Sequence, residues 1–251
     1  MPLNTRMFLI PLALIAVAVG GAIAYAQTVN TNFEQTLSAS VKPNKLKGGK
    51  PTPIALKVTT GADTVPPGGQ PPTLQQAQIF FPNAAVANGR FFPSCTESIL
   101  LNKGPNKCPK QSKIGKGSAI GKVGSLEVKT DVTAFNGPKG KSVLLYVLSV
   151  PSAPVSIRGV LNSPLKKLHG KYGYRLTVPV PQNIQTPLPG LHTGVIFFTT
   201  TVKASIKHKG RMRGYIEAFK CPKGGKAPTR GIFSYIEVPD KTVDTAISCR
   251  R

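Results

Sequence analysis

The stretch SVLLYVLSVPSAPVSIRGVLN, residues 142–162, decides the fold class of this chain. Two runs rich in Val, Ile, Leu and Tyr, residues 142–150 and 155–162, flank the turn formers Pro-Ser-Ala-Pro. β-Branched and aromatic side chains fit a pleated surface, and proline interrupts a strand because it cannot donate to the hydrogen-bond ladder. The stretch therefore predicts two β-strands joined by a turn.

Runs of the same kind recur on both sides of this stretch, separated by turn residues at a spacing typical of β-sandwiches. No intervening segment repeats a helical pattern of useful length. The sequence therefore predicts an all-β protein, an antiparallel β-sandwich of the immunoglobulin-like or jelly-roll-like type. The other predicted strands are residues 33–41, 54–60, 74–82, glycine-punctuated strands within 112–137, and residues 172–180, 194–207, 214–221, 230–238 and 242–249.

The best helix signal in the chain lies near residues 96–103. Thr96 can cap the first turn, and Gly104 and Pro105 end the apolar segment that follows. A helix of about two turns is marginal in water. A covalent tie between the cysteines at its two flanks would therefore stabilise it.

The first 26 residues predict a secretory signal peptide. Arg6 precedes an uncharged apolar run, residues 7–24, and Ala24-Tyr25-Ala26 fits the small-x-small pattern of a cleavage site. We expect cleavage after Ala26 and export of the remaining chain. A retained membrane anchor is the alternative, because the apolar run is just long enough to span a bilayer.

The length of the chain, 251 residues, allows one large all-β domain or two small ones. After cleavage the secreted β-sandwich domain would comprise residues 27–251. Its subdivision into residues 27–95 and 96–251 is the alternative, with the segment PPGGQPP as a long loop inside the first unit.

The chain has four cysteines, and an even number in an oxidising compartment argues for two disulfides. Four cysteines allow three pairings, of which we expect the local one, Cys95–Cys108 and Cys221–Cys249, because it closes short loops. No two cysteines are closer than thirteen positions, which does not fit the close ligand spacing of structural zinc sites. We therefore expect no metal and no cofactor.

Catalytic patterns are weak in this sequence. Three histidines and nine acidic residues leave few ways to build a serine triad, and there is no Gly-x-Ser-x-Gly elbow. The segment GPKGKS, residues 137–142, lacks the first glycine of a phosphate-binding loop. We expect a protein that is not an enzyme, and a secreted hydrolase that uses His192 is the weakest alternative.

The formal net charge of +24 at pH 7 is the strongest indication of a partner. Such a field attracts polyanions and anionic surfaces, although a lysine-rich surface can also serve solubility alone. Two segments, residues 167–175 and 206–220, interleave basic and aromatic side chains. We expect these hairpins to bind an anionic cell-wall polymer or an anionic lipid surface; nucleic acid is less favoured because no named motif is present. The expected polyanion-binding residues are Lys167, Lys171, Arg175, Lys207, Lys209, Arg211 and Arg213.

Two cysteine-containing segments carry a resemblance. FPSC with GPNKCPKQSKIGKGSA, and KCPKGG with FSYIEVPDKTVDTAISCRR, resemble a family of uncharacterised exported proteins from actinobacteria. In that family a Cys-Pro-x-x-Ser-x-Ile/Val-Gly-x-Gly element follows a first cysteine, and a terminal strand pair ends in a last cysteine. The resemblance covers about a third of the chain and implies a secreted β-sandwich with two disulfides. It departs at Ala227-Pro228-Thr229, where an aromatic residue would stand, and it implies no activity.

Two functions follow from these observations as expectations. The first is a non-enzymatic cell-envelope protein that associates with the wall or membrane surface through its basic hairpins. The alternative is a carrier for an apolar ligand enclosed by the β-sheets, although the same inward residues could form an ordinary packed core. The residues expected to line such a cavity are Val143, Leu145, Val147, Ile196, Phe198 and Val202.

Overall fold

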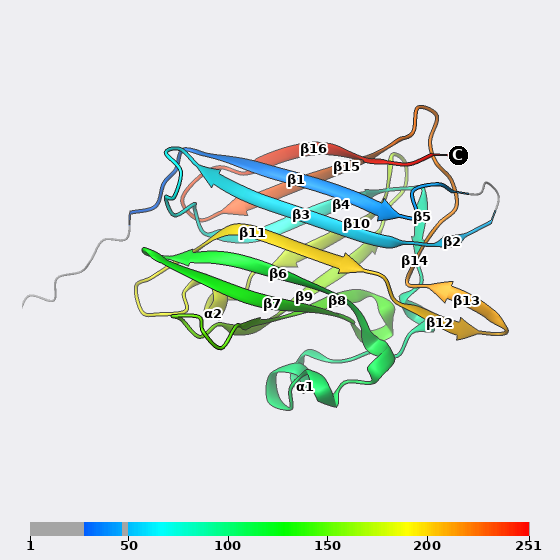
Figure 1. The fold of residues 1–251 in the computed structure, drawn as a ribbon, viewed down its shortest axis with the longest axis horizontal. Helices are drawn as coiled ribbons and strands as arrows, with labels where there is room; N and C mark the ends of the chain where they lie inside the picture. Colours follow the sequence, from blue (N-terminus) through cyan, green and yellow to red (C-terminus); the bar gives the residue numbers. More distant parts are fainter. Residues whose placement is uncertain (1–27, 47–49, 251) are drawn as a thin grey trace, which may run out of the picture.

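A single antiparallel sheet of eleven strands forms the body of the protein in the computed structural model, which describes residues 28–46 and 50–250 (Figure 1). The predicted signal peptide and its cleavage site lie outside the described residues. In order across the sheet, the strands are β1 (Phe33–Lys42), β3 (Ala55–Thr64), β11 (Thr193–Val202), β6 (Lys113–Val123), β7 (Leu126–Asn136), β8 (Ser142–Ser149), β9 (Arg158–Lys167), β10 (Tyr172–Pro179), β4 (Leu74–Pro82), β15 (Lys226–Tyr235) and β16 (Lys241–Ser248). The predicted all-β antiparallel fold is confirmed.

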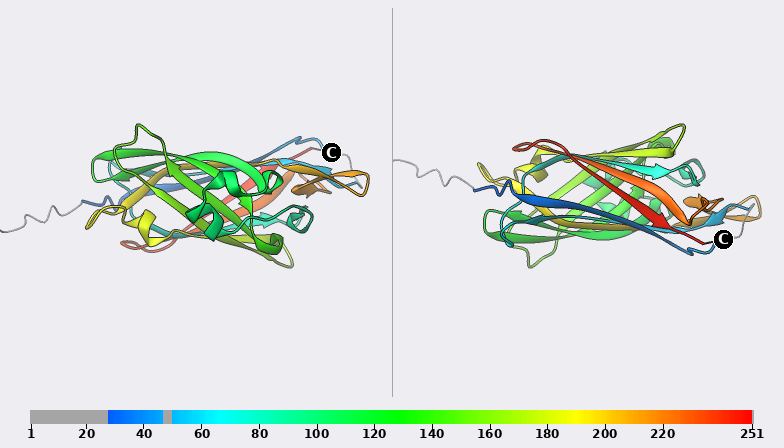
Figure 2. Two further views of the ribbon diagram at one scale, coloured as in Figure 1. Left: turned by 90° about the horizontal axis from the view of Figure 1, so that it is seen from below. Right: turned by 90° about the horizontal axis from the view of Figure 1, so that it is seen from above.

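The sheet curls until its two edge strands, β1 and β16, meet and cross (Figure 2). Each strand is antiparallel to its neighbour, so with an odd number of strands the two edges run parallel where they meet. A bridge pins this seam at one end: Leu46 N donates to Arg250 O over 2.9 Å, and Arg250 N donates to Asn44 O over 2.7 Å. Within the described ranges no ladder joins β1 to β16. The protein is therefore a barrel-like sandwich that is nearly closed.

The two ends of this barrel differ. One end, here called the cap end, carries a small sheet of β2 (Thr52–Pro53), β14 (Ile216–Ala218) and β5 (Ala85–Ala87), and the hairpin of β12 (Ser205–His208) and β13 (Arg211–Gly214). The other end, the α2 end, carries the short helix α2 (Gln182–Gln185). We call the small sheet and the β12–β13 hairpin together the cap. None of the helices in the described part of the chain has the length and apolar character of a membrane-spanning segment.

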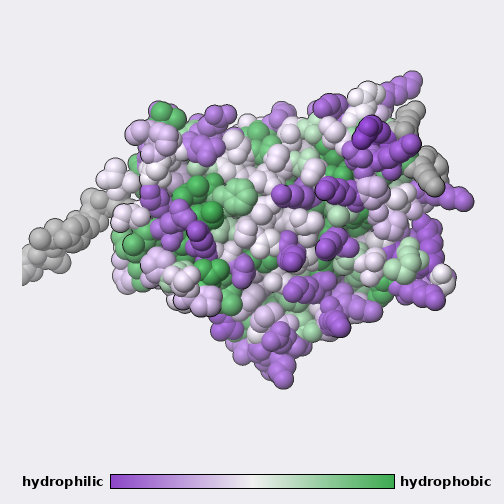
Figure 3. Space-filling model, in the orientation of Figure 1, coloured by the Kyte–Doolittle hydropathy of each residue, from purple (hydrophilic) through white to green (hydrophobic). Residues whose placement is uncertain are grey.

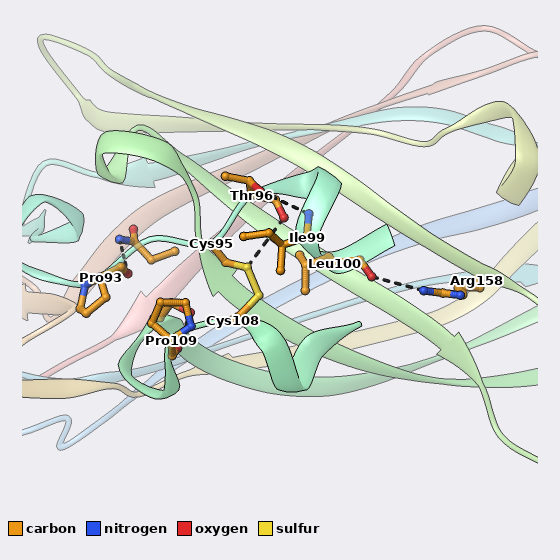
Figure 4. The surroundings of a disulfide bond; sticks show 10 residues. Pro93, Cys95, Thr96, Ile99, Leu100, Cys108, Pro109 and Arg158 are labelled. Atoms are coloured by element: carbon orange, nitrogen blue, oxygen red, sulfur yellow. Dashed lines mark hydrogen bonds between the residues drawn. A yellow bond between two sulfur atoms is a disulfide. The ribbon is translucent and has the colours of Figure 1, made fainter. Parts of the chain in front are cut away.

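The helix α1 (Glu97–Asn102) forms where the sequence predicted it (Figure 4) and packs on the outside of the barrel (Figure 1). The Thr96 hydroxyl accepts a hydrogen bond from Ile99 N over 3.3 Å and so caps the helix. The guanidinium of Arg158 donates to Leu100 O at the other end of the helix. Leu100 is fully buried and belongs to a cluster with Leu144 and other residues of the outer face of the wall. The short 3-10 helices are Gly89–Phe91, Pro105–Lys107, Lys110–Ser112 and Pro138–Gly140.

The position of α1 explains the continuous apolar run from which the fold class was predicted. Side chains of β8 alternate between two faces, and both faces are covered. Val143 and Leu145 point to the interior cluster, whereas Leu144 and Tyr146 lie in the cluster beneath α1. A strand buried on both sides has no polar positions to alternate with apolar ones, so the run reads as uninterrupted.

One strand extends further than predicted. The expected strand ended at residue 162, whereas β9 continues through Pro164 to Lys167. Pro164 stands opposite Ser142, where β8 begins, so its missing N–H falls at the end of the β8 ladder. Beyond it, β9 pairs with β10 instead, with Leu165 opposite Leu176. A proline at this change of partner does not interrupt a central ladder.

Candidate functional site

The inward faces of the strands enclose a cavity of about 240 Å³. Successive side chains of a strand point to opposite faces, so each strand contributes every second residue to the interior. From β8 these are Val143, Leu145 and Val147. The lining reaches from Thr193 near the α2 end to Cys249 beneath the cap and consists almost wholly of apolar side chains. The cavity is therefore elongated and suited to an apolar chain.

Five of the six residues expected to line a cavity do so, and Ile196 does not. The register between β11 and β6 shifts between Val195 and Phe197, so Ile196 is the extra residue of a β-bulge. Before the bulge Val195 lines the cavity; after it, Phe198 and Val202 do. A strict two-residue alternation could not reveal this change of phase.

Two hydroxyl groups on β11 provide polarity within the lining. Thr193 Oγ1 and Thr200 Oγ1 are buried and have no hydrogen-bond partner among the described residues. Thr60, which also lines the cavity, is satisfied by contrast, because its hydroxyl donates to Thr36 O over 2.7 Å. Buried polar atoms are normally paired. The hydroxyls of Thr193 and Thr200 are thus available to a bound molecule or to water.

A buried carboxylate holds the cap together. Glu217 on β14 is fully buried, and its Oε2 accepts a hydrogen bond from Asn88 Nδ2 over 2.9 Å. The same carboxylate forms ion pairs with Arg213 at 3.6 Å and with Arg211 at 3.9 Å. The Arg213 guanidinium also lies 5.0 Å from the centroid of the Phe91 ring. Arg211 and Arg213, which the sequence predicted to bind a polyanion, therefore partly pair with this buried carboxylate.

Lys220 differs from the other residues of the lining in charge and exposure. Among the described residues that line the cavity, it alone carries a formal charge and it alone is exposed. It follows β14 directly and precedes Cys221, whose disulfide to Cys249 ties this segment to the end of β16. The cavity therefore reaches the surface beside Lys220, and we call this place the mouth. Sequence reasoning missed Lys220 because nothing distinguishes it from the other lysines of the chain.

The predicted polyanion-binding residues lie towards the cap end, on two hairpins. Exposed Lys167 and Lys171 flank the turn between β9 and β10, and Arg175 is half-buried on β10. On the β12–β13 hairpin, Lys207, Lys209 and Arg211 are exposed. The space-filling view shows hydrophilic side chains crowded around this hairpin and the adjoining cap (Figure 3).

Acidic residues show the opposite distribution. The register of the strands places Glu34, Asp63, Glu127, Glu237 and Asp240 at or near the α2 end. Within the described cap the only carboxylate is Glu217, which is buried. The barrel consequently has one strongly basic end, and its field draws anions towards the cap.

Both predicted disulfides are formed, Cys95–Cys108 and Cys221–Cys249, with Cα–Cα distances of 5.4 and 5.8 Å. No free cysteine occurs in the described ranges. The first disulfide flanks α1 and the second lies at the mouth, where Cys249 lines the cavity. Two disulfides fit an extracellular protein.

Neither protein-family models, curated proteins nor solved structures match the chain. The resemblance to exported actinobacterial proteins therefore stays a prediction. So does the alternative of a hydrolase: His192 is half-buried in the loop before β11, where its Nδ1 lies 3.4 Å from Thr186 Oγ1.

Proposed function

We propose that the protein is an exported, non-enzymatic carrier that binds an apolar ligand inside the barrel. The observation that supports this most directly is the elongated cavity with its apolar lining. Export is supported by the two disulfides and by the predicted signal peptide. The barrel supplies what such a carrier needs: a wall of hydrogen-bonded strands whose inward side chains exclude water.

An apolar cavity of this size favours an apolar occupant over water. Residual voids destabilise proteins by about 24 cal/mol per Å³. Apolar cavities of smaller volume bind small apolar molecules. A ligand chain in this space would contact the apolar lining, and this supports the proposal of a carrier.

Displacement of a neutral fluorophore tests the proposal. The full chain, purified without detergent, is saturated with phenylnaphthylamine and titrated with straight-chain alcohols of increasing length. Burial of a methylene contributes about 0.8 kcal/mol, so the affinity should rise about fourfold per methylene until the chain fills the cavity. No binding, or an affinity that does not depend on chain length, would contradict a carrier.

A pair of variants on β6 locates the binding. Ala119 lines the cavity, whereas Ser118 beside it does not. Ala119→Phe should fill the space and abolish alcohol binding, and Ser118→Phe, which adds the same ring on the other face, should leave it unchanged. Equal losses in both variants would place the alcohol outside the cavity.

We also propose that the cap end associates with an anionic surface of the cell envelope, a wall polymer or a lipid. The observation that favours this second function is the gathering of exposed Lys207, Lys209 and Arg211 at an end with few acids. The two functions are compatible, because the mouth of the cavity opens at the same end. A carrier that docks there would present its mouth to the surface from which it loads.

A further inference from the structure

The side chain of Lys220 at the mouth is charged, whereas the lining behind it is almost wholly apolar. The Lys220 ammonium lies 5.7 Å from the centroid of the Phe219 ring, and no carboxylate among the described residues pairs with it. The nearest acid along the chain, Glu217, is buried and already bound by Asn88 and two arginines. Lys220 is therefore a cation free to bind an anion at the edge of an apolar space.

The surroundings of Lys220 favour the same sign of ligand. Lys223 and Lys226 follow within six positions and are exposed, and the Lys45–Arg250 bridge closes the seam at this end of the barrel. The disulfide from Cys221 holds the mouth in place. A cation beside a disulfide-tied segment and within a basic field is suited to the charged end of a molecule whose remainder is apolar.

We infer that the cavity takes a single-chain amphiphile with an anionic head group, whose chain lies among the inward side chains and whose head group is bound by Lys220. This inference rests on the proposed function, because it requires an apolar chain inside the barrel. The elongated lining fits a single chain, and its volume of about 240 Å³ is small for several. A carboxylate and a phosphate monoester offer the same chemistry to an ammonium group, a compact anion with oxygen acceptors.

The test compares ligands that differ only in the head group. Dodecanol, dodecanoate and dodecyl phosphate are titrated at pH 7.5 into the full chain saturated with phenylnaphthylamine. Lys220→Met keeps an unbranched apolar stem and removes the charge. Lys226→Met removes an exposed charge close by that does not line the cavity. Lys220→Met should weaken binding of one or both anions about fivefold, the upper range for an exposed ion pair, and leave dodecanol unchanged.

The outcomes separate this inference from the proposed function. Weakening of dodecanoate alone identifies a carboxylate as the head group, and weakening of dodecyl phosphate alone identifies a phosphate. Weakening of both identifies a site that accepts either anion. Each of these three results supports the inference. If dodecanol and both anions bind alike and Lys220→Met changes none of them, the cavity is a carrier site without head-group recognition. An equal loss of anion binding in Lys226→Met would show that the basic residues at this end attract anions collectively. It would overturn the assignment of Lys220 as the residue that binds the head group. Failure of all three ligands to bind would refute the carrier itself.

Discussion

Tyr215 donates a hydrogen bond from its phenol to Asn136 Oδ1 over 3.2 Å, and this contact joins the cap to the wall of the barrel. Asn136 ends β7 and is fully buried, and its Nδ2 donates to the carbonyl oxygens of Gly89, Phe92 and Pro93. One amide thus holds the chain that leads to the first disulfide as well as the tyrosine beside β14. Because Tyr215 also lines the cavity, its ring is shared between the cap and the candidate site.

Substitution of Tyr215 by Phe should change the pH dependence of stability. Burial raises the pKa of Tyr215 above its ordinary value of about 10. The folded protein therefore retains this proton at alkaline pH, where the unfolded chain releases it. The contribution of the phenol to stability is full below pH 10 and is lost as the pH rises through the folded-state pKa.

Two quantities follow for Tyr215→Phe in urea unfolding. At pH 8 the variant should be less stable by about 1–2 kcal/mol, because Asn136 Oδ1 loses its partner in a buried place. Above pH 10 the difference in unfolding free energy between the two proteins should shrink by up to about 1.4 kcal/mol per pH unit. Tyr235, whose pKa is also raised by burial, remains in both proteins and cancels from the comparison. A gap that stays constant from pH 8 to 11 would show that Tyr215 ionises freely in the fold.

Gly117→Ala should destabilise the barrel. A Cβ at Gly117 on β6 would press on the carbonyl oxygen of Thr199 and lie 2.7 Å from the Thr200 Cα, both backbone atoms of β11. Such crowding typically costs about 1–3 kcal/mol. Gly121→Ala on the same strand is the control. Its Cβ would lie 3.0 Å from the Thr193 methyl, which belongs to a side chain that can rotate, and 3.6 Å from the Gly194 carbonyl oxygen, an ordinary contact distance. Equal unfolding free energies for the two variants would contradict the close approach of β6 and β11.

The strands could be predicted from the sequence because their signal is local. Residues 74–82 were predicted as a strand and form β4 with those bounds. The short helix was predicted from its cap at Thr96 and its stop at Gly104, and both disulfides from the compartment and from loop length. These features depend on residues that are close in the sequence, so the sequence alone is sufficient to predict them.

Features that depend on distant parts of the chain could not be predicted. The bulge at Ile196 arises in the pairing of β11 with β6, and it reverses the inward phase that a simple alternation assigns. Lys220 is distinguished only by the cavity that it lines, and Arg213 is less available to a polyanion because it pairs with Glu217. Each of these outcomes is a tertiary contact, which composition and periodicity do not record.

Removal of the two disulfides should have unequal effects on the site. On the chain-entropy model, Cys95→Ala/Cys108→Ala and Cys221→Ala/Cys249→Ala should lower the unfolding free energy by about 3 and about 3.6 kcal/mol. Their effects on alcohol binding should differ, because Cys249 lines the cavity and Cys221 adjoins Lys220, whereas the first pair flanks α1 on the outside. We expect weaker binding only in the second variant at a temperature where both are folded. Unchanged binding in both would show that the mouth keeps its shape without the covalent tie.

Charge reversal at the cap end tests the surface association. Lys167, Lys207 and Lys209 are changed together to Glu, and Arg211 and Arg213 are left intact because both pair with buried Glu217. The control reverses Lys122, Lys129 and Lys241, which lie towards the α2 end and bring the same change in net charge. Cosedimentation with phosphatidylglycerol vesicles and with purified cell wall should be lost in the first variant at moderate salt and persist in the control. Equal losses in both would mean that net charge alone attracts the protein, because an unspecific counterion effect depends on total charge and falls with salt.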